Sequence, residues 1–463
     1  MKTGAPSTAR RLARQALAFA PQPLPEAVAR KAKICLLDYL CCVFESRDLE
    51  TSRQAVAVTR PAGRGAQVIG TNILAHPADA AFANATTGHG LVREDMHVPS
   101  IGHHGVVVWP ALLALAQREP VRGARFLAAA VIGYEAAARI GTALFDAEIA
   151  RLFRPTGLAS PIGAALGGAY MVGLDEDGCT RALSLAVNTA SGLNQWPHSG
   201  GGEMYFHPGF AARNAVTAVE LAEVGAHASE DVIEGEAGLI AAFRRKPARA
   251  EIALFAGDRP EILAVFNKPA PACNYAQTPC QAALQVAREL GAQRREIQSV
   301  SVRASDAALR YPGCNFKGPF ERPLQAKMSI QFGVAAALAN AALEEANYRI
   351  PESAEIRRLV AATSLAADAE FTSAYPARQS AEVEVVLNDG SRMARQLDDV
   401  VPATEIEVRE RFRRAAVAVV GDDTAREMER LVDGLEQASD AGRVAALCRT
   451  SAARPERRER VAP

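Results

Sequence analysis

The sequence predicts a mainly α-helical protein with a large all-α domain and a smaller α+β domain. Aromatic residues make up only 6% of the chain while alanine is abundant, which favours closely packed helices over sheet. Apolar residues recur at helical spacing through most of the first half. Alternation typical of half-buried strands begins only after about residue 260. We therefore assign 1–265 and 401–463 to the all-α domain and 266–400 to the α+β domain.

Helices fill most of the first part of the chain. The first of them is expected to begin at Pro25-Glu26, because proline is common in the first turn of a helix. One segment is apolar on nearly all sides, which indicates burial among other helices. The glycine-rich stretch 197–209 is expected to be a long loop of functional interest. The expected helices cover residues 27–44, 78–92, 106–119, 123–144 (the apolar one), 160–174, 176–193 and 210–226.

The second part mixes strands and helices. Residues 297–303 alternate like a strand, and 381–397 read as a hairpin around an Asn-Asp-Gly turn. Helices are expected before and between these strands, and again after residue 400, where they are predicted to pack back on the first domain. A disordered tail is expected from about Thr450. These helices cover residues 278–292, 329–343, 404–420 and 425–437.

Charge and motif content narrow the possible functions. Lys+Arg and Asp+Glu both number 52, so no net field attracts nucleic acid or a membrane surface. The eight cysteines include no CxxC pair, and without a secretory signal we expect reduced thiols in a cytoplasmic protein. No uninterrupted apolar run has transmembrane length. The P-loop, the dinucleotide-binding glycine motif, HExxH and GxSxG are all absent from the sequence.

Five ordered motifs carry a family resemblance. The stretch 91–106, LVREDMHVPSIGHHGV, belongs to a region that holds four of the eight histidines. It is followed by RPTGLASPIGAALGGAYMVGLDED, FHPGFAARNAV, VIEGEAGLIAAF and NKPAPACNYAQTPCQAAL. Together they resemble the MmgE/PrpD family, whose members act on small polycarboxylates as dehydratases, decarboxylases or epimerases. The resemblance implies an all-α domain with an α+β lid, a homodimer, and no metal or organic cofactor.

This sequence departs from the family pattern at most of its polar site positions. Two residues match the family's site: His103 and Lys268. The other positions hold Val92 in place of an aspartate, Met96 for a threonine, Arg154 for a histidine, Met204 for a lysine, Gln277 for a histidine and Phe332 for a tyrosine.

Lys268 and His103 are the predicted catalytic residues. A lysine in an apolar cleft at a domain junction can have its pKa lowered by desolvation, which would make it a base near neutral pH. Histidine can act as acid, base or hydrogen-bond donor in the same range. The structural alternatives are a surface lysine at a hinge and a loop histidine that caps the helix beginning near Gly105.

The other candidates are assigned to substrate binding. Arg154 supplies a planar cation suited to a carboxylate, or else it pairs with Glu94 or Asp95. Met96, Met204 and Val92 predict a more apolar ligand than the family's usual one, or simply fill core space. His97 and Tyr275 are expected to line the same pocket, and Asp95 to orient His97 or His103. His89, His104 and His207 are predicted to be structural.

The family resemblance and the residues that match it imply a cofactor-independent enzyme that abstracts or transfers a proton next to a carbonyl or carboxyl group of a small molecule. It would act as a lyase or as an epimerase or isomerase, and not as a 2-methylcitrate dehydratase. The alternatives are a specialised biosynthetic enzyme such as a cyclase, and a catalytically silent binding member of the family. A small-molecule substrate and a second copy of the chain are the expected partners.

Overall fold

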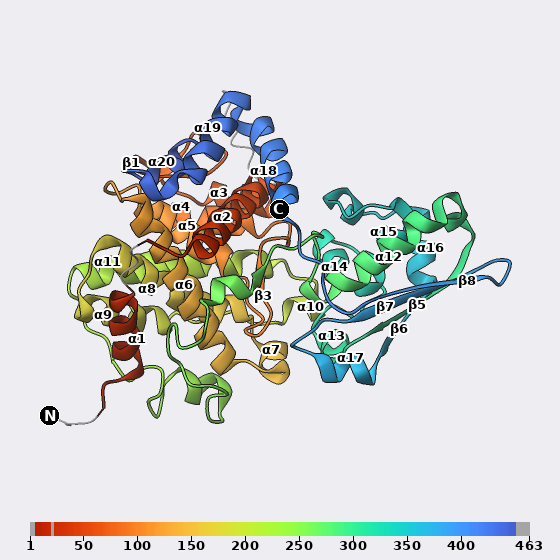
Figure 1. The fold of residues 1–463 in the computed structure, drawn as a ribbon, viewed down its shortest axis with the longest axis horizontal. Coiled ribbons are helices and arrows are strands. Elements are labelled where there is room, and N and C mark those ends of the chain that lie inside the picture. Colours follow the sequence, from red (N-terminus) through yellow and green to blue (C-terminus); the bar gives the residue numbers. More distant parts are fainter. Residues whose placement is uncertain (1–4, 20–22, 451–463) are drawn as a thin grey trace.

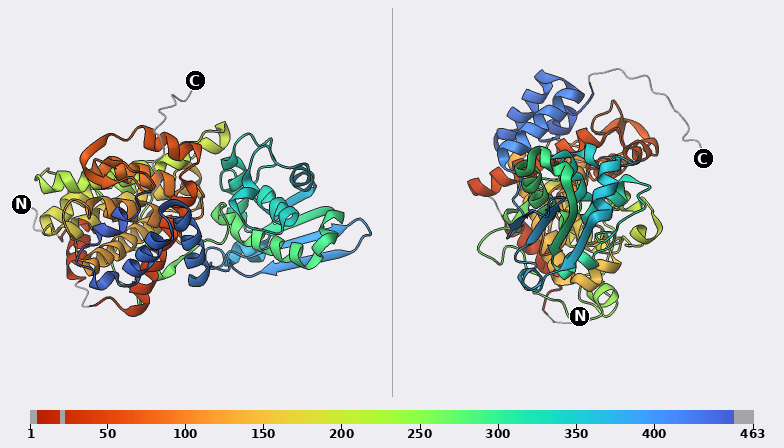
Figure 2. Two further views of the ribbon diagram at one scale, coloured as in Figure 1. Left: turned by 90° about the horizontal axis from the view of Figure 1, so that it is seen from above. Right: turned by 90° about the vertical axis from the view of Figure 1, so that its right-hand side faces the viewer.

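The computed structural model describes residues 5–19 and 23–450 and forms two bodies (Figure 1). A helical body contains the N-terminal helices and the last three α-helices, which are α18 (Glu405–Val420), α19 (Asp422–Asp433) and α20 (Gly442–Ala446). A smaller body contains a sheet with helices on it, and its strands extend away from the helical body (Figure 2). Almost all of the tail that was expected to be disordered lies outside the described residues.

The core of the helical body is built from the long helices that the sequence predicts. Helix α6 covers its predicted range of residues, and each of the other helices begins or ends within a few residues of its own predicted range. These helices are α2 (Glu26–Ser46), α4 (Pro77–Gly88), α5 (Gly105–Leu115), α6 (Gly123–Leu144), α8 (Pro155–Val172), α9 (Glu176–Val187) and α11 (His207–Glu223). Three shorter helices that were not predicted from the sequence lie around them. They are α1 (Thr8–Ala18), α3 (Glu50–Ala57) and α7 (Ala147–Leu152).

Helix α6 is long and apolar enough to cross a membrane by length and composition alone, the only such helix among the described residues. Its most apolar window is 89% buried inside the protein. Core helices of folded domains pass the same test, and α6 contacts α8 along its length. Its apolarity is therefore accounted for by packing.

Close packing of α6 and α8 depends on small residues. A Cβ atom added at Gly163 would lie 2.2 Å from the carbonyl oxygen of Gly133 and 2.8 Å from Ala137. Because backbone cannot yield as a flexible side chain does, the two helices would have to separate.

We expect Gly163→Ala to lower the free energy of unfolding by about 1–3 kcal/mol, measured by urea denaturation. Gly202→Ala is the matched control, since nothing lies within 4 Å of the added Cβ there. Equal stability of the two variants would show that the packing at Gly163 does not restrict side-chain size.

The smaller body is a four-stranded sheet with the order β6-β5-β7-β8. The predicted strand and hairpin are confirmed as β5 (Ile297–Ala304), β7 (Ala381–Leu387) and β8 (Arg392–Leu397). Strand β6 (Thr363–Ala367), parallel to β5, was not predicted, because its sequence TSLAA lacks a clear alternation of large apolar residues. The helices of this body are α12 (Gln277–Leu290), α13 (Asp306–Arg310), α14 (Pro323–Met328), α15 (Ile330–Asn340), α16 (Ala354–Ala362) and α17 (Ala369–Ala374).

The two bodies are joined at a short junction. Strand β3 (Met96–His97) pairs antiparallel with β4 (Val265–Phe266), which ends two residues before Lys268. The chain later returns through α18 (Glu405–Val420), which packs on α2, followed by α19 (Asp422–Asp433) and α20 (Gly442–Ala446). This return agrees with the predicted packing of the C-terminal helices.

Two local expectations were wrong. The segment 197–209 is not a long loop: it holds the short helix α10 (Trp196–Ser199) and a 3-10 turn (Glu203–Phe206), and then begins α11. Pro197 and Pro208 stand in first turns, and Gly200 ends α10 in the left-handed region at φ 72°. The region expected to be all-α also contains the antiparallel pair β1 (Pro61–Gln67) and β2 (Leu74–Ala75).

Candidate active site

A small cavity lies between the two bodies. Its volume is about 10 Å³, close to the space that one water molecule needs. The helical body contributes the residues up to 154, and the smaller body contributes the rest. A ligand larger than water therefore enters only when the two bodies or their side chains move apart. The lining residues are Val92, Met96, Ile101, His103, Arg154, Cys273, Asn274, Tyr275, Tyr311 and Met328.

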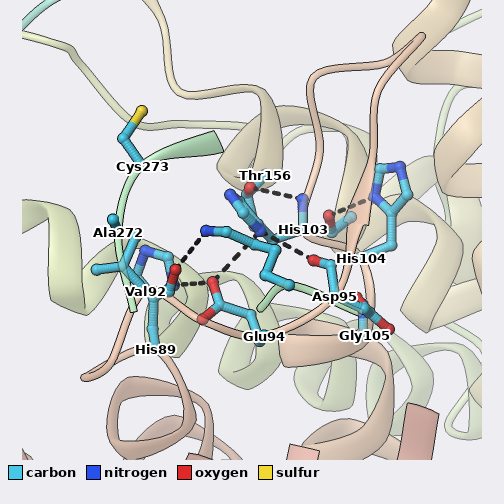
Figure 3. Close-up of polar contacts among 12 residues, drawn as sticks. His89, Val92, Glu94, Asp95, His103, His104, Gly105, Thr156, Ala272 and Cys273 are labelled. Atoms are coloured by element: carbon cyan, nitrogen blue, oxygen red, sulfur yellow. Dashed lines mark hydrogen bonds and ion pairs between the residues drawn. The ribbon is translucent and has the colours of Figure 1, made fainter. Parts of the chain in front are cut away.

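His103 is held in one orientation at this cavity. Its Nδ1 lies 2.9 Å from the backbone carbonyl of Asp95, and its backbone N–H donates to the Thr156 hydroxyl at 3.1 Å (Figure 3). A carbonyl only accepts, so Nδ1 carries the proton and Nε2 is left as the basic nitrogen. Burial holds the pKa of His103 well below its ordinary value despite the nearby carboxylate of Glu94. The imidazole is therefore neutral at neutral pH.

Glu94 links this histidine to a second one. Its Oε1 lies 2.5 Å from Nδ1 of His89 and 3.4 Å from Nδ1 of His103 (Figure 3). Burial would raise the pKa of Glu94, but His89, His103 and Lys268 outweigh that effect and lower it well below its ordinary value. Glu94 is thus a buried carboxylate placed to stabilise a proton that arrives on His103.

Arg154 reaches the cavity from the N-cap of α8. Its Nη1 donates to the Tyr311 hydroxyl at 3.1 Å, and its Nη2 donates to Nε2 of His89 at 3.1 Å. Its Nε is buried without a hydrogen-bond partner. The expected alternative, a pair with Glu94 or Asp95, is not formed directly. An unsatisfied guanidinium N–H beside a cavity is suited to donate a hydrogen bond to a carboxylate oxygen.

Lys268 is fully buried, which excludes the surface-hinge alternative. It is not among the residues that line the cavity, but its ammonium donates to the carbonyl of Val92, which is one of them. Burial lowers the pKa of Lys268 to about 8, although Glu94 acts in the opposite direction. Arg411 donates to the Lys268 carbonyl at 3.0 Å, so the backbone of this residue is also fixed.

Two lining residues have strained backbones. Val92 and Ile101 have φ values of 55° and 53°, in the left-handed region that β-branched residues adopt only at a cost of about 1–3 kcal/mol. At Val92 this conformation accompanies the contact between its carbonyl and Lys268. Where the family carries an aspartate side chain, this protein thus presents a backbone carbonyl to a lysine.

The smaller body closes the cavity with tyrosines and a thiol. The Tyr275 and Tyr375 hydroxyls lie 2.8 Å apart, and the Tyr275 ring packs 5.2 Å from that of Tyr311. Burial raises the pKa of Tyr275 well above its ordinary value, so it remains a protonated donor. Cys273 lies 3.5 Å from Cys314, sulfur to sulfur.

Several predicted residues are located elsewhere. His97 does not line the cavity: its Nδ1 lies 2.7 Å from the Ser100 hydroxyl and its Nε2 lies 2.9 Å from Glu261. Met204 is fully buried in the core, which is the space-filling alternative. His104 has the structural role expected of it, because both ring nitrogens contact serine hydroxyls.

Asp95 does not orient a histidine with its carboxylate. The carboxylate instead accepts from the backbone N–H of Gly105, at the start of α5, at 3.3 Å. It also accepts from the hydroxyl of Tyr134 on α6. Asp95, not His103, therefore provides the side-chain contact at this helix start. Burial raises the pKa of Asp95 to about 6.

Part of the polar cluster was not predicted from the sequence. Glu94 was assigned only to local ion pairs, His89 to helix packing, and Cys273 and Tyr311 were not considered as site residues. Spacing gives a usable signal for Glu94, since a buried acid near several histidines needs partners. Tyr311 and Cys273 lie far from 88–109 in sequence, and only the packing of the two bodies brings them together. Among the described residues no group of three or more His, Cys, Asp or Glu side chains could hold a metal ion.

Comparisons with known proteins agree with the motif resemblance. The MmgE/PrpD N-terminal domain matches residues 10–251, and the MmgE/PrpD C-terminal domain matches 270–437, a range that includes α18 and α19 of the helical body. Similar proteins include the cis-aconitate decarboxylase-like protein oryM of Aspergillus oryzae, 26% identical over 92% of this chain and 94% of its own. A cis-aconitate decarboxylase of Aspergillus terreus is 25% identical over 91% and 92%, and a human one is 23% identical over 79% and 78%. The chain belongs to the MmgE/PrpD family.

Proposed function

We propose that this protein is a lyase-type enzyme that removes a proton from the carbon next to a carboxylate of a small organic acid. The observation that carries the proposal is the pair of His103 and Arg154 at one cavity. His103 offers a basic Nε2 because its Nδ1 proton is engaged by a carbonyl. Arg154 offers an unpaired N–H to an anion beside it.

The proton transfer follows from these contacts. The substrate carboxylate binds Arg154, which orients the adjacent C–H toward His103 Nε2. As His103 takes the proton it becomes cationic, and the Glu94 carboxylate 3.4 Å from its Nδ1 stabilises that charge. Tyr275 or Tyr311 donates a hydrogen bond to the oxygen or leaving group that gains negative charge.

Lys268 has a different role in this proposal from the one the sequence suggested. It does not line the cavity, and its ammonium is engaged by the Val92 carbonyl. We assign it to the charge balance of Glu94 and to the position of Val92 rather than to contact with substrate.

The lining supports a substrate with few carboxylates. Val92, Met96, Ile101 and Met328 are apolar, and Arg154 is the one cation among the residues that line the cavity. Each further anionic group would be desolvated without a cationic partner, at a cost of several kcal/mol. A monocarboxylate, or an acid with one anionic end and one apolar end, fits this lining.

Hydrogen exchange tests the function even while the product is unidentified. The purified chain is incubated in D₂O with a panel of small carboxylic acids, and NMR follows loss of the proton next to the carboxylate. We expect catalysed exchange with at least one acid of the apolar-ended kind. A panel without any exchange, on a chain that is shown to bind those acids, would favour the catalytically silent alternative.

Turnover of the family's usual substrates is expected to be absent. 2-Methylcitrate and cis-aconitate each carry three carboxylates, whereas the cavity lining offers one cation. We expect neither compound to be consumed by the purified chain, as followed by chromatography or by absorbance of the unsaturated acid. Relatives of the chain are named as cis-aconitate decarboxylases. Efficient turnover of either compound would overturn the assignment of an apolar substrate.

We also propose that the chain forms a homodimer. On α11, Phe210, Leu221 and the adjoining Val224 share one face by helical spacing and are 47%, 41% and 80% exposed. Light scattering of the purified chain is expected to give twice the mass of 49.1 kDa. A monomer at micromolar concentration would contradict this proposal.

A further inference from the structure

Cys273 is the one nucleophilic sulfur that lines the cavity. It stands directly before the 3-10 turn Asn274–Ala276, on the wall formed by the smaller body. Its backbone is fixed, because its N–H donates to the Lys327 carbonyl at 2.8 Å and its carbonyl accepts from Gln277 at 3.2 Å. Gln277, which replaces a family histidine, thus holds the cysteine loop rather than touching the cavity.

The surroundings of Cys273 favour the nucleophilic form of the thiol. Burial alone would raise the pKa of this thiol, but the Cys314 thiol 3.5 Å away, the Lys268 charge and the Tyr275 backbone N–H together lower it to about 7. Cys314 has its own pKa raised well above the ordinary value, so it is the donor of the pair. The other buried cysteines lack this combination: burial raises the pKa of Cys280 to about 12.

A second observation points to the charge of the ligand. Arg154 lines the same cavity, is 4% exposed and has a buried Nε without a partner. A molecule whose carboxylate meets Arg154 would have its neighbouring carbons inside a cavity that Cys273 also borders. A nucleophile and an anion anchor at one confined site together select electrophiles that are small and anionic.

We propose that Cys273 is a covalent capture site for small carboxylates that carry a soft electrophilic carbon, such as α-halo acids and α,β-unsaturated acids. With a halo acid, the sulfur forms a bond to carbon as the carbon–halogen bond breaks and halide leaves. With an unsaturated acid, the sulfur bonds to the β-carbon, the π bond breaks, and a proton adds to the α-carbon. Neither step needs an oxidant or a reductant.

The inference rests on the carboxylate-binding part of the proposed function and not on turnover. Alkylation of Cys273 is a stoichiometric mass change, so it is measured whether or not any acid exchanges its protons. If Cys273 is labelled but no acid exchanges its protons, the proposed enzyme activity is contradicted and the capture site is supported. If an acid exchanges its protons but Cys273 is not labelled, the capture site is contradicted and the enzyme activity is supported.

The test compares iodoacetate with iodoacetamide, which share the reacting carbon and differ in the carboxylate. The folded full-length chain is treated with each at pH 7, at concentrations where the rate is proportional to reagent, and labelling of each cysteine is followed by peptide mass mapping. Glutathione gives the reference ratio for a free thiol. We expect the iodoacetate-to-iodoacetamide ratio at Cys273 to exceed that reference by about tenfold, which corresponds to about 1.4 kcal/mol. A ratio equal to that of glutathione, or labelling no faster than at Cys280, would overturn the proposal.

Two variants separate the anchor from the nucleophile. Arg154→Met is expected to return the ratio to the glutathione value, and Arg154→Lys, which keeps the charge, to retain part of the preference. Cys314→Ala is expected to slow both reagents equally, because it removes the hydrogen-bond donor to the sulfur and leaves the anion anchor. Circular dichroism confirms that each variant is folded. A folded Arg154→Met chain with an unchanged ratio would contradict the role of Arg154.

Discussion

Replacing His103 with glutamine is expected to slow deuterium exchange next to the substrate carboxylate by a factor of about 100 to 10,000, the range that a positioned general base contributes. The amide side chain can still donate to the Asp95 carbonyl, which accepts from Nδ1 of His103 at 2.9 Å in the parent. It cannot take a proton at neutral pH. Exchange is measured by NMR in D₂O with the acid that the parent exchanges fastest.

The neighbouring histidine provides a matched control. His104 is equally buried, but its two ring nitrogens contact Ser160 and Ser100 and it does not line the cavity. His104→Gln is expected to lower the melting temperature and to leave the exchange rate of the folded fraction unchanged. If both variants lost exchange to the same degree, the effect would be one of loop structure, and His103 would not be the base.

The pH dependence gives a second test of the same assignment. Burial depresses the pKa of His103, so its neutral, basic form persists as the pH falls below 6.5. We expect the exchange rate of the saturated enzyme to stay flat through pH 6.5 on the acid side. A free histidine would lose half of its basic form there.

Sequence patterns were sufficient for the elements whose residues interact with near neighbours in the chain. Helix α6 and the β7–β8 hairpin were predicted closely, because a sustained apolar period and an Asn-Asp-Gly turn are local signals. Strand β6 was missed because its place is set by pairing with β5, more than 50 residues earlier. Sequence periodicity does not report such distant partners.

The candidate site was predictable to the same limit. His103, Arg154, Val92, Met96 and Tyr275 were selected by resemblance and all line one cavity. Lys268 and His97 were selected by the same means, yet neither lines the cavity. Lys268 donates to the Val92 carbonyl, and His97 contacts Ser100 and Glu261. A motif identifies positions along the chain, whereas orientation depends on partners from other segments.

Glu94 shows why orientation matters. In sequence it is one of two adjacent acids, and only Asp95 was expected to orient a histidine. The backbone turns them apart: Asp95 contacts the start of α5, whereas Glu94 contacts His89 and His103 (Figure 3). Val92, whose φ is in the left-handed region, lies two residues before Glu94.

Replacing Glu94 with glutamine is expected to have the largest effect on stability. Glu94 is 1% exposed, and its loss removes the acceptor 2.5 Å from Nδ1 of His89 and the negative charge that favours the buried ammonium of Lys268. Leaving a buried charge without its compensating charge costs about 3–5 kcal/mol. We expect a loss of that size in the free energy of unfolding, measured by urea denaturation at pH 7.

A more exposed glutamate is the matched control. Glu427 pairs with Arg443 at 3.0 Å, and 46% and 59% of the two side chains are exposed. Glu427→Gln is expected to cost less than about 1 kcal/mol, as pairs open to solvent do. A cost for Glu94→Gln no greater than for Glu427→Gln would mean that Glu94 does not balance the charges around it.

Lys268→Met tests the other partner of the cluster. The lysine has a pKa of about 8 in the folded protein against 10.5 for an unperturbed side chain, so between these values the unfolded chain binds the extra proton. The cost of burying the ammonium is present in full below pH 8 and is relieved as the pH rises toward 10.5. The parent is therefore expected to gain about 3 kcal/mol relative to Lys268→Met across that window. An unchanged difference between the two proteins would show that Lys268 is not the titrating group.

The double variant decides whether Glu94 and Lys268 act as a pair. If their charges compensate each other, Glu94→Gln in the Lys268→Met background costs less than in the parent, because no unpaired ammonium remains. We expect the summed costs of the two single changes to exceed the cost of the double change by about 1–3 kcal/mol, the coupling typical of groups in one charged network. Additive effects would separate Lys268 from the His103 cluster and would leave His89 and His103 as the groups that Glu94 stabilises.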